Sequence, residues 1–166
     1  MNFIFTLQYL KRKRPVYYLD ESGFDEFYYK THGYSLRGQP IYQEVLGKRF
    51  QRTNVIAALH DKQIIVPFYN KGNVDAQIFE TWLEKFFLPS IPRRSVIVMD
   101  NAPFHRKEQI YAIARKRKCR VIFLPPYSPN LNPIEPKWAN TKKKLRKETR
   151  GYQTFDMALS HSLGIV

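Results

Sequence analysis

Three carboxylates occupy positions in which side chains can bind divalent metal ions. Asp20 follows the apolar run at 16–19, Asp100 follows the apolar run at 96–99, and Glu135 follows a proline-rich stretch. Hard cations such as Mg²⁺ prefer oxygen ligands, and two of them about 4 Å apart can stabilise both the attacking and the leaving oxygen of a phosphoryl displacement. The three acids therefore predict a catalytic metal site that cuts or joins nucleic acid.

Each acid taken singly also has an ordinary structural explanation. An aspartate after a strand often serves in a turn, and Asp100 could form an Asx turn with the residues that follow it. Glu135 could be the reciprocal partner in a capping box, with Asn132 as the N-cap and Pro133 at the first helical position. Two aspartates at strand ends and a glutamate at a helix start, all in one basic domain, favour the metal site over three separate structural roles.

Two further acids lie near Asp20 and could replace it as a ligand. Glu21 is next in sequence, and Asp25 lies a few residues further along. Because successive side chains of a strand point to opposite faces, a strand that continued this far would direct Glu21 away from the face that carries Asp20. Asp20 is therefore the preferred ligand.

Residues around the acids are candidates for contact with a nucleic-acid backbone. The helix predicted to begin near residue 132 places Glu135, Lys142 and Arg146 on one face, so the two bases could meet phosphates on either side of a scissile bond. A solvated basic face also explains these bases, and a capping or surface role also explains a lone histidine. The candidates for DNA contact are Asn101, His105, Tyr127, Lys142 and Arg146.

The pattern of apolar residues predicts the elements that position these side chains. β-branched and aromatic runs predict strands at 16–19, 52–59, 63–69, 95–99 and 120–124. Apolar stripes predict helices at 74–87, capped by Asn73, at 106–118 and at 132–147. This order predicts an α/β fold with a mixed five-stranded sheet flanked by helices. Because ligands of such sheets bind outside the carboxyl ends of strands, Asp20 and Asp100 are expected to share a site.

Composition restricts the partner of this chain. The 166 residues carry 28 Lys and Arg against 14 Asp and Glu, which gives a net charge of +14 and favours a polyanion. The longest apolar runs are far shorter than the roughly 20 residues that span a bilayer, and the start of the chain has its apolar residues before its basic ones, unlike a secretory signal. Charge alone does not distinguish DNA, RNA and an anionic membrane as the partner. Since no apolar run could span a bilayer, we expect no membrane segment and a cytoplasmic protein whose single Cys119 is a structural thiol.

Four segments resemble the catalytic domain of DDE transposases, specifically the bacterial insertion-sequence relatives of mariner transposases. They are YLDESGF at 18–24, GYSLRGQP at 33–40, VIVMDNAPFH at 96–105 and LPPYSPNLNPIEPKW at 124–138. Asp100 and Glu135 are separated by 34 residues, which is the spacing of the second and third acids in that family. Tyr34 stands where relatives often have tryptophan.

The resemblance implies an RNase H-like fold in which Asp20, Asp100 and Glu135 are the catalytic residues and bind two Mg²⁺ or Mn²⁺ ions. It implies hydrolysis of a phosphodiester at the transposon end, followed by attack of the freed 3′-hydroxyl on target DNA. The implied partners are double-stranded DNA, further copies of the chain, and a helix-turn-helix segment for end recognition, encoded upstream or fused. The expected organisation is a basic lead-in at 1–15, the catalytic domain at 16–150, and a tail or short helix at 151–166.

Two other functions remain open at this point. A transposase remnant could bind DNA or inhibit a complete enzyme without catalysis, because relatives carry their end-recognition modules ahead of the catalytic domain. A stand-alone RNase H-like nuclease or resolvase would use similar carboxylates on a similar fold. The spacing of Asp100 and Glu135 favours the transposase over the nuclease.

Overall fold

The computed structural model describes residues 3–26, 51–126, 128–148 and 152–165. Its strands are β1 (Val16–Asp25), β2 (Arg52–His60), β3 (Gln63–Asn70), β4 (Val96–Met99) and β5 (Arg120–Phe123). Its α-helices are α1 (Phe3–Lys11), α2 (Ala76–Trp82), α3 (Leu88–Ser90), α4 (Lys107–Arg115), α5 (Ile134–Glu148) and α6 (Phe155–Leu163), with a π-helix η1 (Leu83–Phe87) and a 3₁₀ turn η2 (Pro129–Leu131). The segment at 33–40, with Tyr34, and Tyr127 lie outside the described residues.

The five strands form one mixed sheet in the order β3-β2-β1-β4-β5. β1 is central, since it pairs antiparallel with β2 and parallel with β4. β2 and β3 are antiparallel, whereas β4 and β5 are parallel. The predicted five-stranded mixed sheet flanked by helices is therefore confirmed.

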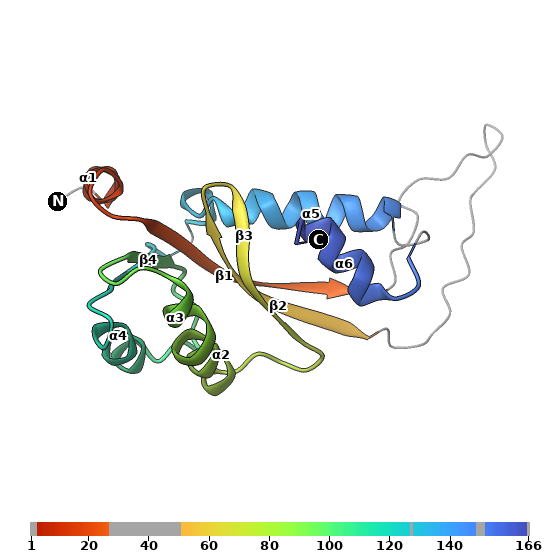
Figure 1. Cartoon of the computed structure of the whole chain (residues 1–166), viewed down its shortest axis with the longest axis horizontal. Coiled ribbons are helices and arrows are strands. Elements are labelled where there is room, and N and C mark those ends of the chain that lie inside the picture. Colours follow the sequence, from red (N-terminus) through yellow and green to blue (C-terminus); the bar gives the residue numbers. More distant parts are fainter. Residues whose placement is uncertain (1–2, 27–50, 127, 149–151, 166) are drawn as a thin grey trace.

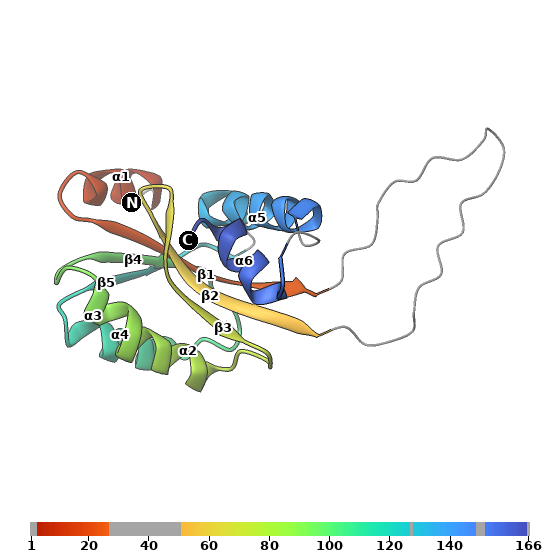
Figure 2. The ribbon, with the colours of Figure 1, turned by 45° about the vertical axis from the view of Figure 1, so that its right-hand side comes forward.

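Helices cover the sheet on both faces and create two cores (Figures 1 and 2). One core joins β1 and β2 to α1, α5 and α6, with Trp138 and Leu145 among its buried members. The other joins the opposite face of the strands to α2, η1, α3 and α4, with Trp82 and Ile110 fully buried. β4 is buried along its whole length, as expected of a strand that is covered on both faces. None of the helices in the described ranges is long and apolar enough to span a membrane.

The first strand is longer than the sequence predicts. The predicted strand ends before Asp20, but β1 continues to Asp25 because β2 pairs with it from Tyr18 through Asp25. The parallel ladder with β4 stops earlier, at the pair Leu19 and Met99. Asp20 therefore lies within β1, not at its tip, at the point where the strand loses its parallel neighbour.

The helix that precedes β4 also departs from the prediction. Its N-cap is Asp75, not Asn73, since the Asp75 Oδ1 accepts a hydrogen bond of 2.8 Å from the Ile78 amide. The helix changes to π geometry over η1 and continues past Pro89 to Ser90. Pro89 lies near the C-terminal end of this continuous helical segment, directly after the π-helical turn η1.

Candidate metal and nucleic-acid site

The register of the parallel strands brings Asp20 and Asp100 to one place. Leu19 of β1 and Met99 of β4 form the last pair of their ladder, so the next residue of each strand is an aspartate. Beyond this pair, β1 continues along β2, whereas the chain after Asp100 leaves the sheet for the loop that leads to α4. The side chain of Asp100 is 44 % exposed, and Asp20 is buried.

α5 brings the third predicted acid to the same place. Its apolar face packs on β1, and the Trp138 Nε1–H donates a hydrogen bond of 3.0 Å to the Asp20 Oδ2. Glu135 lies three residues earlier, in the first turn of α5. Asp100 and Glu135 line one open pocket of ≈ 340 Å³. The other residues that line this pocket are Asn101, Ala102, Pro103, Leu124, Pro125, Pro126, Ser128 and Asn132.

The three acids interact electrostatically. Burial, followed by the charges of Glu135 and Asp100, raises the pKa of Asp20 to about 7, against hydrogen bonds from the Glu21 backbone and from Trp138 that lower it. Each neighbouring carboxylate therefore disfavours ionisation of Asp20. A divalent cation between them would reverse this effect, because it favours the ionised form of all three.

A second group of side chains reaches Asp100 from the other face of the sheet. The His105 Nε2 lies 3.2 Å from the Asp100 Oδ1 and 3.9 Å from the Glu21 Oε1. One potential ligand atom of each of these three residues lies within 4.8 Å of the other two. The His105 ring packs against Phe79 and Phe104, with centroid distances of 4.6 and 4.2 Å. Burial, followed by the charges of Asp20 and Asp100, raises the pKa of Glu21 well above its usual range.

Sequence reasoning placed Glu21 correctly but underestimated its part in the site. Asp20 faces Trp138 on the α5 side, whereas Glu21 faces His105 on the opposite side, as strand alternation predicts. Asp100 lies beyond the end of β4, so side chains from both faces of β1 reach it. The motif that carries His105 five residues after Asp100 was the available signal for this second group.

Two of the ordinary structural roles were also tested by the geometry. The Ala102 amide donates to the Asp100 Oδ1 at 3.3 Å, so an Asx turn is present together with the acidic cluster. The capping box was wrong, since the helix begins at Ile134 and the Asn132 Oδ1 is buried without a hydrogen-bond partner in the described part of the chain. The Asn132 backbone carbonyl, not its side chain, accepts from the Glu135 amide at 3.2 Å.

The donor atoms of the site fit a hard divalent cation. The carboxylates of Asp20, Asp100 and Glu135 supply oxygen, which Mg²⁺ and Mn²⁺ prefer. The buried Oδ1 of Asn132 and Oε1 of Glu21 form no hydrogen bond to any residue that the structure describes. Asn132 lines the same pocket as Asp100, and a carboxylate oxygen of Glu21 lies within 4.8 Å of one of Asp100. Such unpaired buried oxygens are rare in folded proteins and are relieved by a cation or by water bound to one.

The candidates for DNA contact occupy different environments. Asn101 is exposed at the mouth of the pocket, and Lys142 lies beside β1 with its Nζ 5.5 Å from the Phe24 ring centroid. Arg146 is exposed one turn further along α5. The His105 side chain is only 1 % exposed, so it is placed to orient Asp100 and not to touch DNA. Tyr127 is outside the described residues.

Comparison with known proteins places these features in a family. The model of a family described as DDE superfamily endonuclease matches residues 15–157. The Tcb1 transposase of Caenorhabditis briggsae is 30% identical over 79 residues, which is 45% of this chain and 29% of the relative. The Tc1 transposase of Caenorhabditis elegans is 32% identical over 68 residues, which is 41% of this chain and 25% of the relative. The matches therefore span less than a third of these curated relatives.

Solved structures share the fold at low sequence identity. A Mos1 transposase paired-end complex with the left transposon end superposes with a TM-score of 0.67 and 17% identity, over 97% of this chain and 55% of that one. The catalytic core domain of BIV integrase gives a TM-score of 0.57 and 12% identity, over 89% of this chain and 80% of that one. The predicted RNase H-like fold is therefore confirmed.

Proposed function

Because the chain belongs to the DDE superfamily endonuclease family, we propose that it cleaves DNA at the ends of a mobile element and joins those ends to target DNA. The curated relatives are transposases, which supports transposition over general nuclease activity. The Mos1 structures with the same fold include paired-end and strand-transfer complexes. We propose that this chain likewise acts on two DNA ends as an oligomer and depends on a helix-turn-helix segment for end recognition. The catalytic domain would extend over residues 16–150.

The observation that carries this proposal is that Asp20, Asp100 and Glu135 interact electrostatically around one pocket, although their carboxylates do not all lie within 4.8 Å of one another. Asp100 and Glu135 line one pocket, and both charges act on the buried carboxyl of Asp20. We assign all three as ligands of two Mg²⁺ or Mn²⁺ ions. Bound there, the ions would hold the scissile phosphate and offset the negative charge that develops on the attacking and leaving oxygens.

The residues around the acids fix their orientation. The Trp138 indole holds one oxygen of Asp20, and the Ala102 amide and His105 hold one oxygen of Asp100. Such hydrogen bonds keep ligand carboxylates in a single geometry, and their loss typically reduces metal affinity or activity about 10- to 100-fold. Glu135 is brought to the pocket by its place in the first turn of α5. Asn101, Lys142 and Arg146 are placed to contact the DNA backbone beside the scissile phosphate.

The test is a cleavage and strand-transfer assay on DNA that carries the terminal repeats of the element. We expect activity that depends on Mg²⁺ or Mn²⁺ and that falls by at least about 1,000-fold in Asp100→Asn. Asp61→Asn is the matched control, since Asp61 is 89 % exposed and its φ of 44° is one that asparagine tolerates. Equal activity of Asp100→Asn and the wild type would refute the catalytic assignment. A preference for RNA–DNA hybrids over duplex DNA would indicate an RNase H-like nuclease instead.

A further inference from the structure

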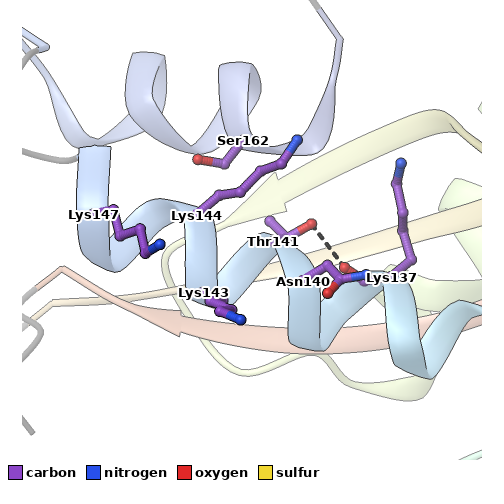
Figure 3. Close-up of a pocket in the computed structure, with 7 residues that line it drawn as sticks. All are labelled: Lys137, Asn140, Thr141, Lys143, Lys144, Lys147 and Ser162. Carbon is purple, nitrogen blue, oxygen red and sulfur yellow. Dashed lines mark hydrogen bonds between the residues drawn. The ribbon is translucent and has the colours of Figure 1, made fainter.

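α5 carries a second basic surface that is separate from the acidic site. An open pocket of ≈ 440 Å³ lies between α5 and α6, and four lysines line it: Lys137, Lys143, Lys144 and Lys147. Lys137 and Lys144 extend on the side of α5 where α6 lies (Figure 3). Among the described residues, no acid lines the pocket. We call these four lysines the lysine patch.

The charges of the lysine patch are not neutralised by the part of the chain that the structure describes. None of the ion pairs formed among the described residues includes one of its four ammonium groups. Lys143 and Lys147 are four residues apart on a helix, and Lys144 and Lys147 are three apart, so their side chains are neighbours and repel one another. An anion that lies along this face would relieve the repulsion.

Two hydroxyl groups form the floor of the pocket. The Thr141 hydroxyl donates to the Lys137 carbonyl at 2.9 Å, so its hydrogen is already used. Ser162 of α6 is 3 % exposed, and its Oγ has no hydrogen-bond partner within the described ranges. Ser162 is therefore a buried polar group that a phosphate oxygen in the pocket could satisfy after a small movement of the lysine stems.

The patch faces a different direction from the metal site. At 100° per residue, the four lysines of the patch centre about 145° around the α5 axis from Glu135, whereas Lys142 and Arg146 lie within about 20° of it. A straight duplex engaged at Glu135 contacts one side of α5 only. Phosphates on the lysine patch must therefore belong to another DNA segment.

The length of the patch suits a duplex backbone. Lys137 and Lys147 are ten residues apart, which is about 15 Å along the helix. Duplex DNA carries one charge per about 1.7 Å of its axis, so several phosphates can lie along this distance. The contacts would be to phosphates alone, so binding would not depend on base sequence.

We infer that the lysine patch of α5, with Ser162 of α6, binds the backbone of a second DNA duplex while the metal site engages the first. The identity of the polyanion rests on the proposed function, because a transposase must hold two DNA segments. The patch thus supplies a sequence-independent hold on one of them.

The test measures binding without catalysis, in EDTA, by titrating the 166-residue chain with a labelled 30-base-pair duplex of arbitrary sequence at 50 and 200 mM salt. The patch variant is Lys143→Gln/Lys144→Gln/Lys147→Gln, in which glutamine preserves helix propensity. Each phosphate contact adds about 0.9 to the slope with which log affinity falls as log salt concentration rises. The wild type's affinity at 50 mM salt divided by its affinity at 200 mM salt should therefore be about 40-fold larger than the same ratio for the patch variant, which lacks three contacts. The matched control is Lys85→Gln/Arg115→Gln/Lys118→Gln, which removes the same charge from exposed positions in η1, at the end of α4 and just after α4. We expect a change of less than about threefold in that ratio for the control.

Several results would overturn the inference. A salt dependence in the patch variant equal to that of the control would show that only net charge matters. The Lys→Arg triple variant at the same three positions keeps the charge and should keep the wild-type salt slope. If this variant also lost the slope, altered folding would be the cause, and thermal unfolding would reveal that independently. With a 12-base-pair duplex, the patch variant should bind one duplex fewer per chain than the wild type, and an unchanged stoichiometry would contradict the second segment. Cleavage with Mg²⁺ is scored separately, so failure of the enzyme assignment and failure of the patch are distinguishable.

Discussion

Replacement of Asp20 by asparagine should stabilise the metal-free protein. Burial and two neighbouring carboxylates raise the pKa of Asp20 to about 7 from its ordinary value of 3.8. The folded chain therefore holds this proton more tightly than the unfolded chain. As the pH rises from about 4 to 7, the unfolded state loses the proton first, so the wild type loses stability, and the loss is complete above about pH 7.

The size of the effect follows from the pKa difference. At 1.36 kcal/mol per unit, a rise from 3.8 to about 7 gives a cost of about 4 kcal/mol at pH 8 and about 1 kcal/mol at pH 4.5. The amide of the Asp20→Asn variant carries no charge at either pH, and its oxygen can still accept from Trp138. The variant should thus gain about 3 kcal/mol relative to the wild type between these two pH values, or roughly 5–10 °C in Tm.

The measurement is thermal or urea unfolding of both proteins in EDTA at pH 4.5 and 8. Asp25→Asn is the matched control, because Asp25 is exposed at the far end of the same strand and should show no comparable pH-dependent gain. Added Mg²⁺ should stabilise the wild type and have little effect on Asp20→Asn. The ionised carboxylate of Asp20 destabilises the metal-free protein, and the same carboxylate is the proposed ligand of the ion. A variant that is less stable than the wild type at pH 8, or a difference that does not change with pH, would refute the electrostatic reasoning.

Three further substitutions separate positioning from folding. Trp138→Phe removes the donor to the Asp20 Oδ2, so the acidic limb of the pH–rate profile should move up by about one unit, and an unchanged limb would contradict this role. His105→Phe keeps an aromatic ring in the packed position but loses the contact with the Asp100 Oδ1. The cleavage rate should fall about 10- to 100-fold with little change in the Tm of the metal-free protein. A large loss of Tm would instead show that His105 is a structural residue. Asn132→Ala should change the free energy of unfolding by less than about 0.5 kcal/mol in urea because its side chain caps no helix, whereas a loss near 1 kcal/mol would restore the capping role.

The sequence predicted the features that depend on local pattern. Apolar runs located every strand, and alternation along β1 correctly separated the faces of Asp20 and Glu21. The length of β1 was not predictable in this way, because YLDESGF is polar after Leu19 and only the pairing with β2 extends the strand to Asp25. Long-range pairing, which no local window contains, decided that boundary.

The caps were mistaken for the same physical reason. Asn73 and Asp75 are both acceptable N-caps, and the choice depends on where the chain leaves β3 and enters α2. Asn132 has the sequence of a cap, yet its side chain is turned toward the pocket that Asp100 and Glu135 line. A buried polar atom without a partner requires an explanation, and the acidic pocket that Asn132 lines supplies one.

The site lies where one strand changes partners, and this explains why five polar groups can meet there. After Leu19, β1 keeps its antiparallel neighbour β2 but no longer pairs with β4. Side chains from both faces of β1 can therefore reach the residues that follow β4. Asp20 approaches Asp100 from the α5 side and Glu21 approaches it from the α4 side, with Glu135 and His105 behind them. Among the described acids of the site, Asp100 both contacts His105 and acts electrostatically on the carboxyl groups of Asp20 and Glu21. Its replacement should weaken the coupling on both faces, whereas replacement of Asp20 should leave the contact between Asp100 and His105 intact.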